Sequence, residues 1–84
     1  MTENDMIKCL KKVLDKNWQD SWSFNDVKNM GLRSIGIDSL NLVNLIIEID
    51  NICKIDLISR NIDWLKIRKI SDLFNEINSA INIE

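Results

Sequence analysis

Apolar side chains recur every three or four positions in several stretches of the chain, which is the spacing of one helical face. One stretch predicts a helix over residues 3–17, and Thr2 with Asp5 three residues later indicates a capping box at its start. Another predicts a last helix over residues 68–81. We expect the buried faces of these two helices to hold Met6, Ile7, Leu10, Val13, Leu14, Ile70, Leu73, Phe74, Ile77 and Ile81.

The most apolar segment predicts a further long helix, from about Ser39 to Cys53. At roughly 100° per residue its side chains separate into a core arc, a solvent arc and a strip between them. The core arc holds Leu42, Leu45, Ile46, Ile49, Ile52 and Cys53, and the solvent arc holds Asn41, Asn44, Glu48 and Asn51. The strip holds Ser39, Val43, Ile47 and Asp50, with Leu40 at its outer edge. A core face alone does not require apolar side chains in this strip, so we expect them either to contact partners or to pack beneath a neighbouring segment.

Residues 18–38 predict no single element, and a loop of that length in a small domain is often functional. Ser23 with Asp26 predicts one short capped turn within the loop. The indole rings of Trp18 and Trp22 are expected to anchor the loop on the helices, because they bury a large apolar area.

A further short helical turn is expected over residues 60–65, with Ser59 or Asn61 as its cap. The segment from Ile55 to Leu57 has some β character, but one isolated strand would have nothing to pair with. The fold class is therefore predicted to be all-α, a small four-helix bundle of three longer helices and one short helix. With 84 residues, the chain should form a single domain over residues 1–84.

The charge of the chain is nearly balanced, with 11 basic and 13 acidic residues and a formal net charge of −2. It lacks the basic stripe of nucleic-acid-binding proteins, so no nucleic-acid partner is expected. No apolar stretch has the length of a membrane span, and the acidic N-terminal segment does not have the pattern of a signal peptide. We therefore expect a cytoplasmic protein without a membrane partner, and a monomer.

The sequence offers little catalytic chemistry of its own. It contains no histidine, which excludes Ser–His and Cys–His nucleophile pairs, and it has no glycine-rich phosphate-binding motif. Its two cysteines, Cys9 and Cys53, lie far apart in apolar segments, so we interpret them as buried thiols of a reducing compartment. No enzymatic activity, catalytic residue or metal site is therefore predicted.

Ser39 stands at the junction between the irregular stretch and the most apolar segment. The chain around it reads Leu32-x-x-Ile35-Gly36-Ile37-Asp38-Ser39-Leu40-x-x-Val43-x-Leu45-Ile46. This pattern resembles the phosphopantetheine attachment region of acyl and peptidyl carrier proteins. Residues 55–57 and 67–73 match later segments of that family, in order and at its spacing, so that the resemblance covers nearly the whole chain.

The resemblance implies a non-catalytic carrier with the acyl-carrier type of helical bundle. Ser39 would bear a 4'-phosphopantetheine arm, taken from coenzyme A by a phosphopantetheinyl transferase, and the thiol of the arm would hold acyl or aminoacyl/peptidyl cargo as a thioester. The other implied partners are a loading enzyme (adenylating or acyltransferase) and downstream condensing or tailoring enzymes. Asp38, Leu40, Val43 and Ile47 would face these partners. In an unmodified protein, Ser39 would be a plain N-cap that contributes about 1 kcal/mol to helix stability.

The charges near this serine indicate the type of carrier. Fatty-acid carriers usually bear acidic residues where this chain has Asn41 and Asn44, so docking to strongly basic enzyme patches would be weak. A discrete carrier of a polyketide or nonribosomal peptide pathway fits better.

Two alternatives stay open at this point. Asp63-Trp64 followed by Lys69-Ile70 resembles D-alanyl carrier proteins of teichoic acid modification. An unmodified adaptor that keeps the carrier fold and binds partners through the helix at 39–53 is an interpretation of another class.

Overall fold

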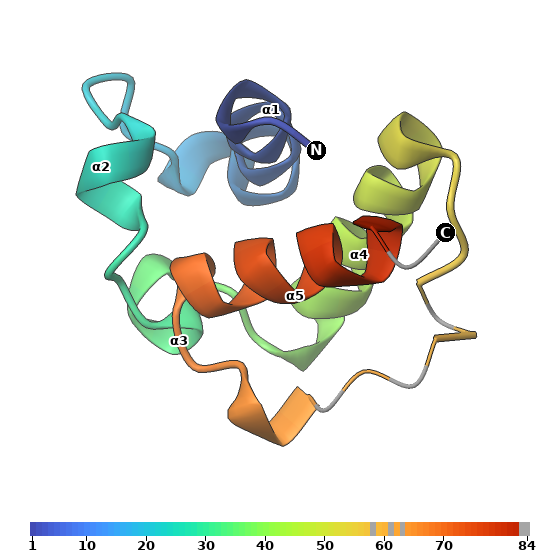
Figure 1. Ribbon diagram of the computed structural model, residues 1–84. Helices are drawn as coiled ribbons and strands as arrows, with labels where there is room; N and C mark the ends of the chain where they lie inside the picture. The colour runs from blue at the N-terminus through green and yellow to red at the C-terminus, as the bar shows by residue number, and fades with distance from the viewer. Residues whose placement is uncertain (58, 61, 63, 83–84) are drawn as a thin grey trace.

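The computed structural model describes residues 1–57, 59, 60, 62 and 64–82, and the regular elements in these ranges are helical. The α-helices are α1 (Glu3–Leu14), α2 (Phe24–Val27), α3 (Leu32–Ile35), α4 (Ser39–Cys53) and α5 (Ile70–Asn82). Two 3-10 turns, η1 (Asp15–Asn17) and η2 (Trp64–Lys66), follow α1 and precede α5. The predicted all-α bundle with three longer helices is confirmed (Figure 1). None of the helices in the described ranges has both the length and the apolar character needed to cross a membrane.

The first helix begins as predicted and ends earlier. The Thr2 hydroxyl accepts a hydrogen bond from the Asp5 backbone N–H at 3.1 Å, and the Asp5 carboxylate accepts one from the Thr2 N–H at 3.2 Å, so the capping box is formed. α1 stops at Leu14 because Asp15 takes a positive φ of 48°, and the chain continues to Asn17 as a 3-10 turn. The expectation of one α-helix over 3–17 is therefore wrong for its last turn.

The segment 18–38 is more regular than expected. The Asp26 carboxylate accepts a hydrogen bond of 2.7 Å from the Ser23 backbone N–H, and this capping box starts α2. A second short helix, α3, forms where irregular chain was expected. Trp18 is buried, and its ring contacts that of Trp22 edge to face at a centroid distance of 5.2 Å. The anchoring role expected for the two indoles is thus confirmed.

The short turn expected over 60–65 lies slightly further along the chain, as η2. Ser59 does not cap it, since its hydroxyl donates to the Asp56 carboxylate at 2.6 Å. Asn61, the other expected cap, lies outside the described residues, as does Asp63.

The last helix begins two residues later than predicted. One carboxylate oxygen of Asp72 accepts the backbone N–H groups of Arg68 and Lys69, at 3.2 and 3.1 Å. These two residues therefore form the lead-in to α5, which starts at Ile70.

The core lies between the three long helices. α1 packs against α4, and the Lys12 ammonium pairs with the Glu48 carboxylate at 3.2 Å across this contact. On α4 the predicted core arc is confirmed for Leu45, Ile46 and Ile49, which are buried. Its assignment is wrong for Ile52, which lies in the last turn of the helix and is 41% exposed.

Two segments far apart in the sequence are joined by backbone hydrogen bonds. The N–H of Leu32 donates to the carbonyl of Arg68 at 3.0 Å, and the N–H of Ile70 donates to the carbonyl of Met30 at 3.1 Å. These bonds hold the start of α5 against the chain that leads into α3, at the same end of α5 where Figure 1 places α2 and α3.

Candidate functional site

The approach to Ser39 is fixed by a tight turn at the end of α3. Gly36 adopts a left-handed φ of 105°, which L side chains rarely tolerate, and its N–H donates to the Arg33 carbonyl at 3.2 Å. The N–H of Ile37 then donates to the Leu32 carbonyl at 2.8 Å, and the Ile37 side chain is buried. This turn closes α3 and delivers the chain to the start of α4.

The helix α4 is capped by Asp38. Its carboxylate accepts a hydrogen bond from the Asn41 backbone N–H at 2.8 Å, and its carbonyl accepts one from Leu42 at 2.9 Å. Ser39 is consequently the first residue of the helix, and the interpretation of this serine as a plain N-cap is wrong. Aspartate and serine cap helices about equally well, so the residue types alone do not distinguish the two positions.

The Asn41 side chain belongs to the same turn. Its amide nitrogen donates to the Gly36 carbonyl at 3.0 Å, and the residue is half-buried. Asn41 was expected on the solvent arc, whereas it ties the first turn of α4 back to the preceding turn. Asn44 is exposed, as that arc predicts.

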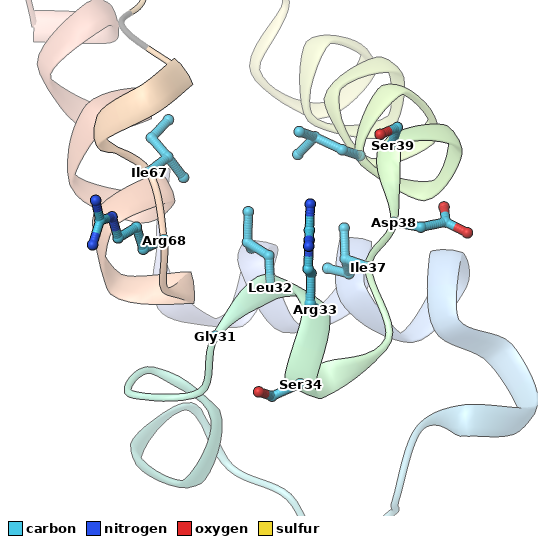
Figure 2. A pocket seen from close by; sticks show the side chains of 10 residues that line it. Gly31, Leu32, Arg33, Ser34, Ile37, Asp38, Ser39, Ile67 and Arg68 are labelled. Atoms are coloured by element: carbon cyan, nitrogen blue, oxygen red, sulfur yellow. The ribbon is translucent and has the colours of Figure 1, made fainter.

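Ser39 is exposed, and its hydroxyl makes no hydrogen bond within the described part of the chain. It lies on the edge of a hollow of about 520 Å³ between the start of α4, the helix α3 and the chain before α5 (Figure 2). The hollow is lined by Gly31, Leu32, Arg33, Ser34, Ile37, Asp38, Ser39, Leu42, Ile67 and Arg68. A second hollow of about 310 Å³ adjoins Ser39 and is lined by Arg33, Gly36, Ile37, Asp38 and Ser39. The arrangement presents an uncommitted hydroxyl to a second molecule, with open space beside it.

The apolar strip of α4 is exposed to solvent. Leu40, Val43 and Ile47 are 71%, 50% and 44% exposed, so the expectation that they pack beneath a neighbouring segment is wrong. Such a row of apolar side chains is a candidate contact surface for another protein. Asp50, assigned to the same strip, has a structural role instead, because its carboxylate accepts the backbone N–H of Leu57 at 3.0 Å.

Sequence reasoning missed an exposed apolar residue, Leu65, and a charged residue at the site, Arg33. Leu65, in η2, is 89% exposed. Arg33 lines both hollows beside Ser39. The only signal for Arg33 in the sequence is its position between Leu32 and Ile35, two apolar residues of a helix too short to be recognised by periodicity.

The cysteines contribute no exposed nucleophile to this site. Cys9 is buried in α1, and its burial raises the pKa of the thiol to about 11. Partial burial also raises the pKa of the Cys53 thiol above its usual value. Both thiols are therefore protonated at neutral pH, the less reactive form of cysteine.

Comparisons of the chain with protein-family models, with curated proteins and with solved structures each gave no match.

Proposed function

We propose that this protein is a non-catalytic carrier that holds acyl or aminoacyl/peptidyl intermediates as thioesters on a 4'-phosphopantetheine arm attached to Ser39. The observation that carries the proposal is the state of the Ser39 hydroxyl, which is exposed and makes no hydrogen bond within the described residues. It is not needed to cap α4, because Asp38 does so. The resemblance of the surrounding sequence to the attachment region of carrier proteins supports the same residue.

The residues around Ser39 fit a phosphodiester at that position. In the attachment reaction the Ser39 oxygen would attack the phosphorus of coenzyme A that bears the pantetheine. A new P–O bond forms, the pyrophosphate P–O bond breaks, adenosine bisphosphate leaves, and the hydroxyl proton passes to a base of the transferase. The product is an anion at the first residue of α4, where backbone N–H groups of the first turn have no partner within the helix and the helix dipole is positive. When bound, the group supplies the thiol that carries the cargo.

The exposed strip beside the serine suits recognition by partner enzymes. Leu40, Val43 and Ile47 would give the transferase, the loading enzyme and the condensing or tailoring enzymes an apolar contact next to the arm. One carboxylate oxygen of Asp38 accepts the Asn41 N–H, and the side chain is otherwise exposed to solvent, where its charge can contact a partner. A cytoplasmic location accompanies the proposal, in keeping with two cysteines that form no disulfide.

A polyketide or nonribosomal peptide pathway is the assignment that we favour for the cargo. The solvent-exposed Asn44 is uncharged, so the middle of α4 lacks an acidic side chain that a strongly basic patch on a partner enzyme would attract. Intact mass spectrometry of the protein from its native host would weigh the cargo directly. An extended acyl or peptidyl chain would support this assignment, while alanine would support a D-alanyl carrier.

Attachment itself is tested with coenzyme A and a broad-specificity phosphopantetheinyl transferase, followed by intact mass spectrometry. The wild-type chain should gain the mass of one phosphopantetheine, and Ser39→Ala should gain none. Ser34→Ala is the matched control, because Ser34 is also exposed and lines the same hollow. A folded wild-type chain that stays unmodified beside an active transferase would overturn the proposal and favour the unmodified adaptor.

A further inference from the structure

The guanidinium of Arg33 is a charge beside Ser39 that the function proposed above does not use. Besides Arg33, the residues common to both hollows are Ile37, Asp38 and Ser39. Figure 2 shows the Arg33 side chain extending from α3 into the hollow, between the side chains of Leu32 and Ile37, whereas the Arg68 side chain on the opposite wall points away from the hollow. We propose that Arg33 is the residue that binds the phosphate group on Ser39, an inference that rests on the proposed attachment of the arm.

The backbone of Arg33 is held firmly although its side chain is exposed. Its helix is fixed at the start by the Leu32 N–H bond to the Arg68 carbonyl at 3.0 Å, and in the middle by the buried Ile35. The left-handed Gly36 closes the same helix. A guanidinium on such a support loses less freedom on binding an anion than one on a mobile loop.

The side chain of Arg33 is also uncommitted. Across the described ranges it forms neither an ion pair nor a side-chain hydrogen bond, and the ion pair of Lys12 with Glu48 lies elsewhere, between α1 and α4. A guanidinium presents several N–H donors in a planar fork, which matches two oxygens of a phosphate. Arg33 therefore has both the charge and the free donors that a phosphodiester requires.

Asp38 explains why a cation is needed at this point. Asp38 is the residue before Ser39, and its carboxylate would repel a phosphodiester attached to that serine. Asp38 stays in place because it caps α4, through its bond to Asn41. Arg33 lines the same two hollows as Asp38 and Ser39, so it offsets this repulsion.

The test uses the arm-bearing protein and phosphorus NMR of its single phosphodiester. We compare the wild type with Arg33→Gln, and use Arg68→Gln as the matched control, since it removes the same charge from the opposite wall of the larger hollow. At about 0.02 M salt, where the Debye length is tens of ångströms, the wild-type resonance should be shifted from that of Arg33→Gln. Raising salt to about 1 M should move the wild-type resonance toward the Arg33→Gln position, because screening weakens the contact. Arg68→Gln should behave as the wild type.

Arg33→Lys gives a second measurement that keeps the charge and removes the planar fork. Its resonance should lie between those of the wild type and Arg33→Gln, and circular dichroism should give the same helical content for all variants. Identical resonances in the wild type and Arg33→Gln at low salt would overturn this inference and leave the attachment intact. An equal displacement in Arg68→Gln would also overturn it, as a general effect of charge. A wild-type chain that accepts no arm would overturn the attachment and this inference together.

Discussion

The Asp38 carboxylate accepts a 2.8 Å hydrogen bond from the Asn41 backbone N–H, and this bond makes Asp38 the cap of α4. Ser39 can therefore present its hydroxyl to solvent without leaving the helix start uncapped. The capping role and the proposed attachment role fall on neighbouring residues, so substitutions can separate them.

Asp38→Ala should lower the free energy of unfolding by about 1 kcal/mol, because it removes the acceptor for the Asn41 N–H. Asp38→Asn keeps an oxygen acceptor and should be nearly as stable as the wild type. Urea unfolding followed by circular dichroism measures both. Equal losses in the two variants would show that the negative charge at the helix start matters more than the capping bond. If Asp38→Asn folds normally but its rate of arm attachment is lower than that of the wild type, the transferase recognises the charge of the carboxylate.

Gly36→Ala should destabilise the protein by about 1–2 kcal/mol, since an L side chain is strained at a φ of 105°. It should also slow arm attachment, because this turn sets the position of Asp38 and Ser39. Gly31→Ala is the control. Gly31 has a φ of −66°, and an added methyl would meet Ser34 Oγ at an ordinary 3.5 Å. That variant should be neutral or more stable by up to about 1 kcal/mol in the same urea assay. A tolerated Gly36→Ala would contradict the left-handed turn.

Leu40→Ala and Val43→Ala should each change stability by less than about 0.5 kcal/mol, because both side chains are exposed. They should nevertheless lower kcat/KM for arm attachment by removing apolar contact with the transferase. Ile49→Ala, on the buried face of the same helix, should lower the free energy of unfolding by about 2–5 kcal/mol. It serves as the contrasting control, in which the substitution acts on stability. Unchanged attachment kinetics in both surface variants would remove the strip from the transferase contact.

Thiol alkylation near neutral pH should follow the order arm thiol, Cys53, Cys9. Burial raises the pKa of Cys9 to about 11, and partial burial raises that of Cys53, so little thiolate is present at either position. Mass spectrometry at increasing reaction times gives the order, and addition of urea should make Cys9 as reactive as Cys53. Fast labelling of Cys9 in the native protein would show that α1 opens readily.

Much of the fold is local in origin and was predictable for that reason. The capping boxes of Thr2 with Asp5 and Ser23 with Asp26 join residues three apart, and the length of α4 follows from its apolar periodicity. α3 could not be predicted from four residues, because its start is held by the Arg68 carbonyl, far along the chain. Ile52 was misplaced because a helical wheel gives direction without showing whether another element covers it.

At the candidate site, the sequence predicted that a helix starts at Ser39 but did not show which residue caps it. Either Asp38 or Ser39 is a good cap by residue type, and only the backbone geometry assigns the role to Asp38. The exposure of Leu40 and Val43 depends on the packing of elements distant in the sequence, which no local pattern records. Arg33 gives no signal of its own, since its place beside Ser39 depends on the turn at Gly36.

The backbone bonds from Leu32 to Arg68 and from Met30 to Ile70 also decide how the larger hollow can deform. They hold the walls formed by α3 and by the chain before α5 together. The start of α4, where Ser39 and Leu42 lie, is joined to α3 through the turn at Gly36 and the hydrogen bond from the Asn41 amide to the Gly36 carbonyl, so any widening of the hollow requires α4 to move about that turn.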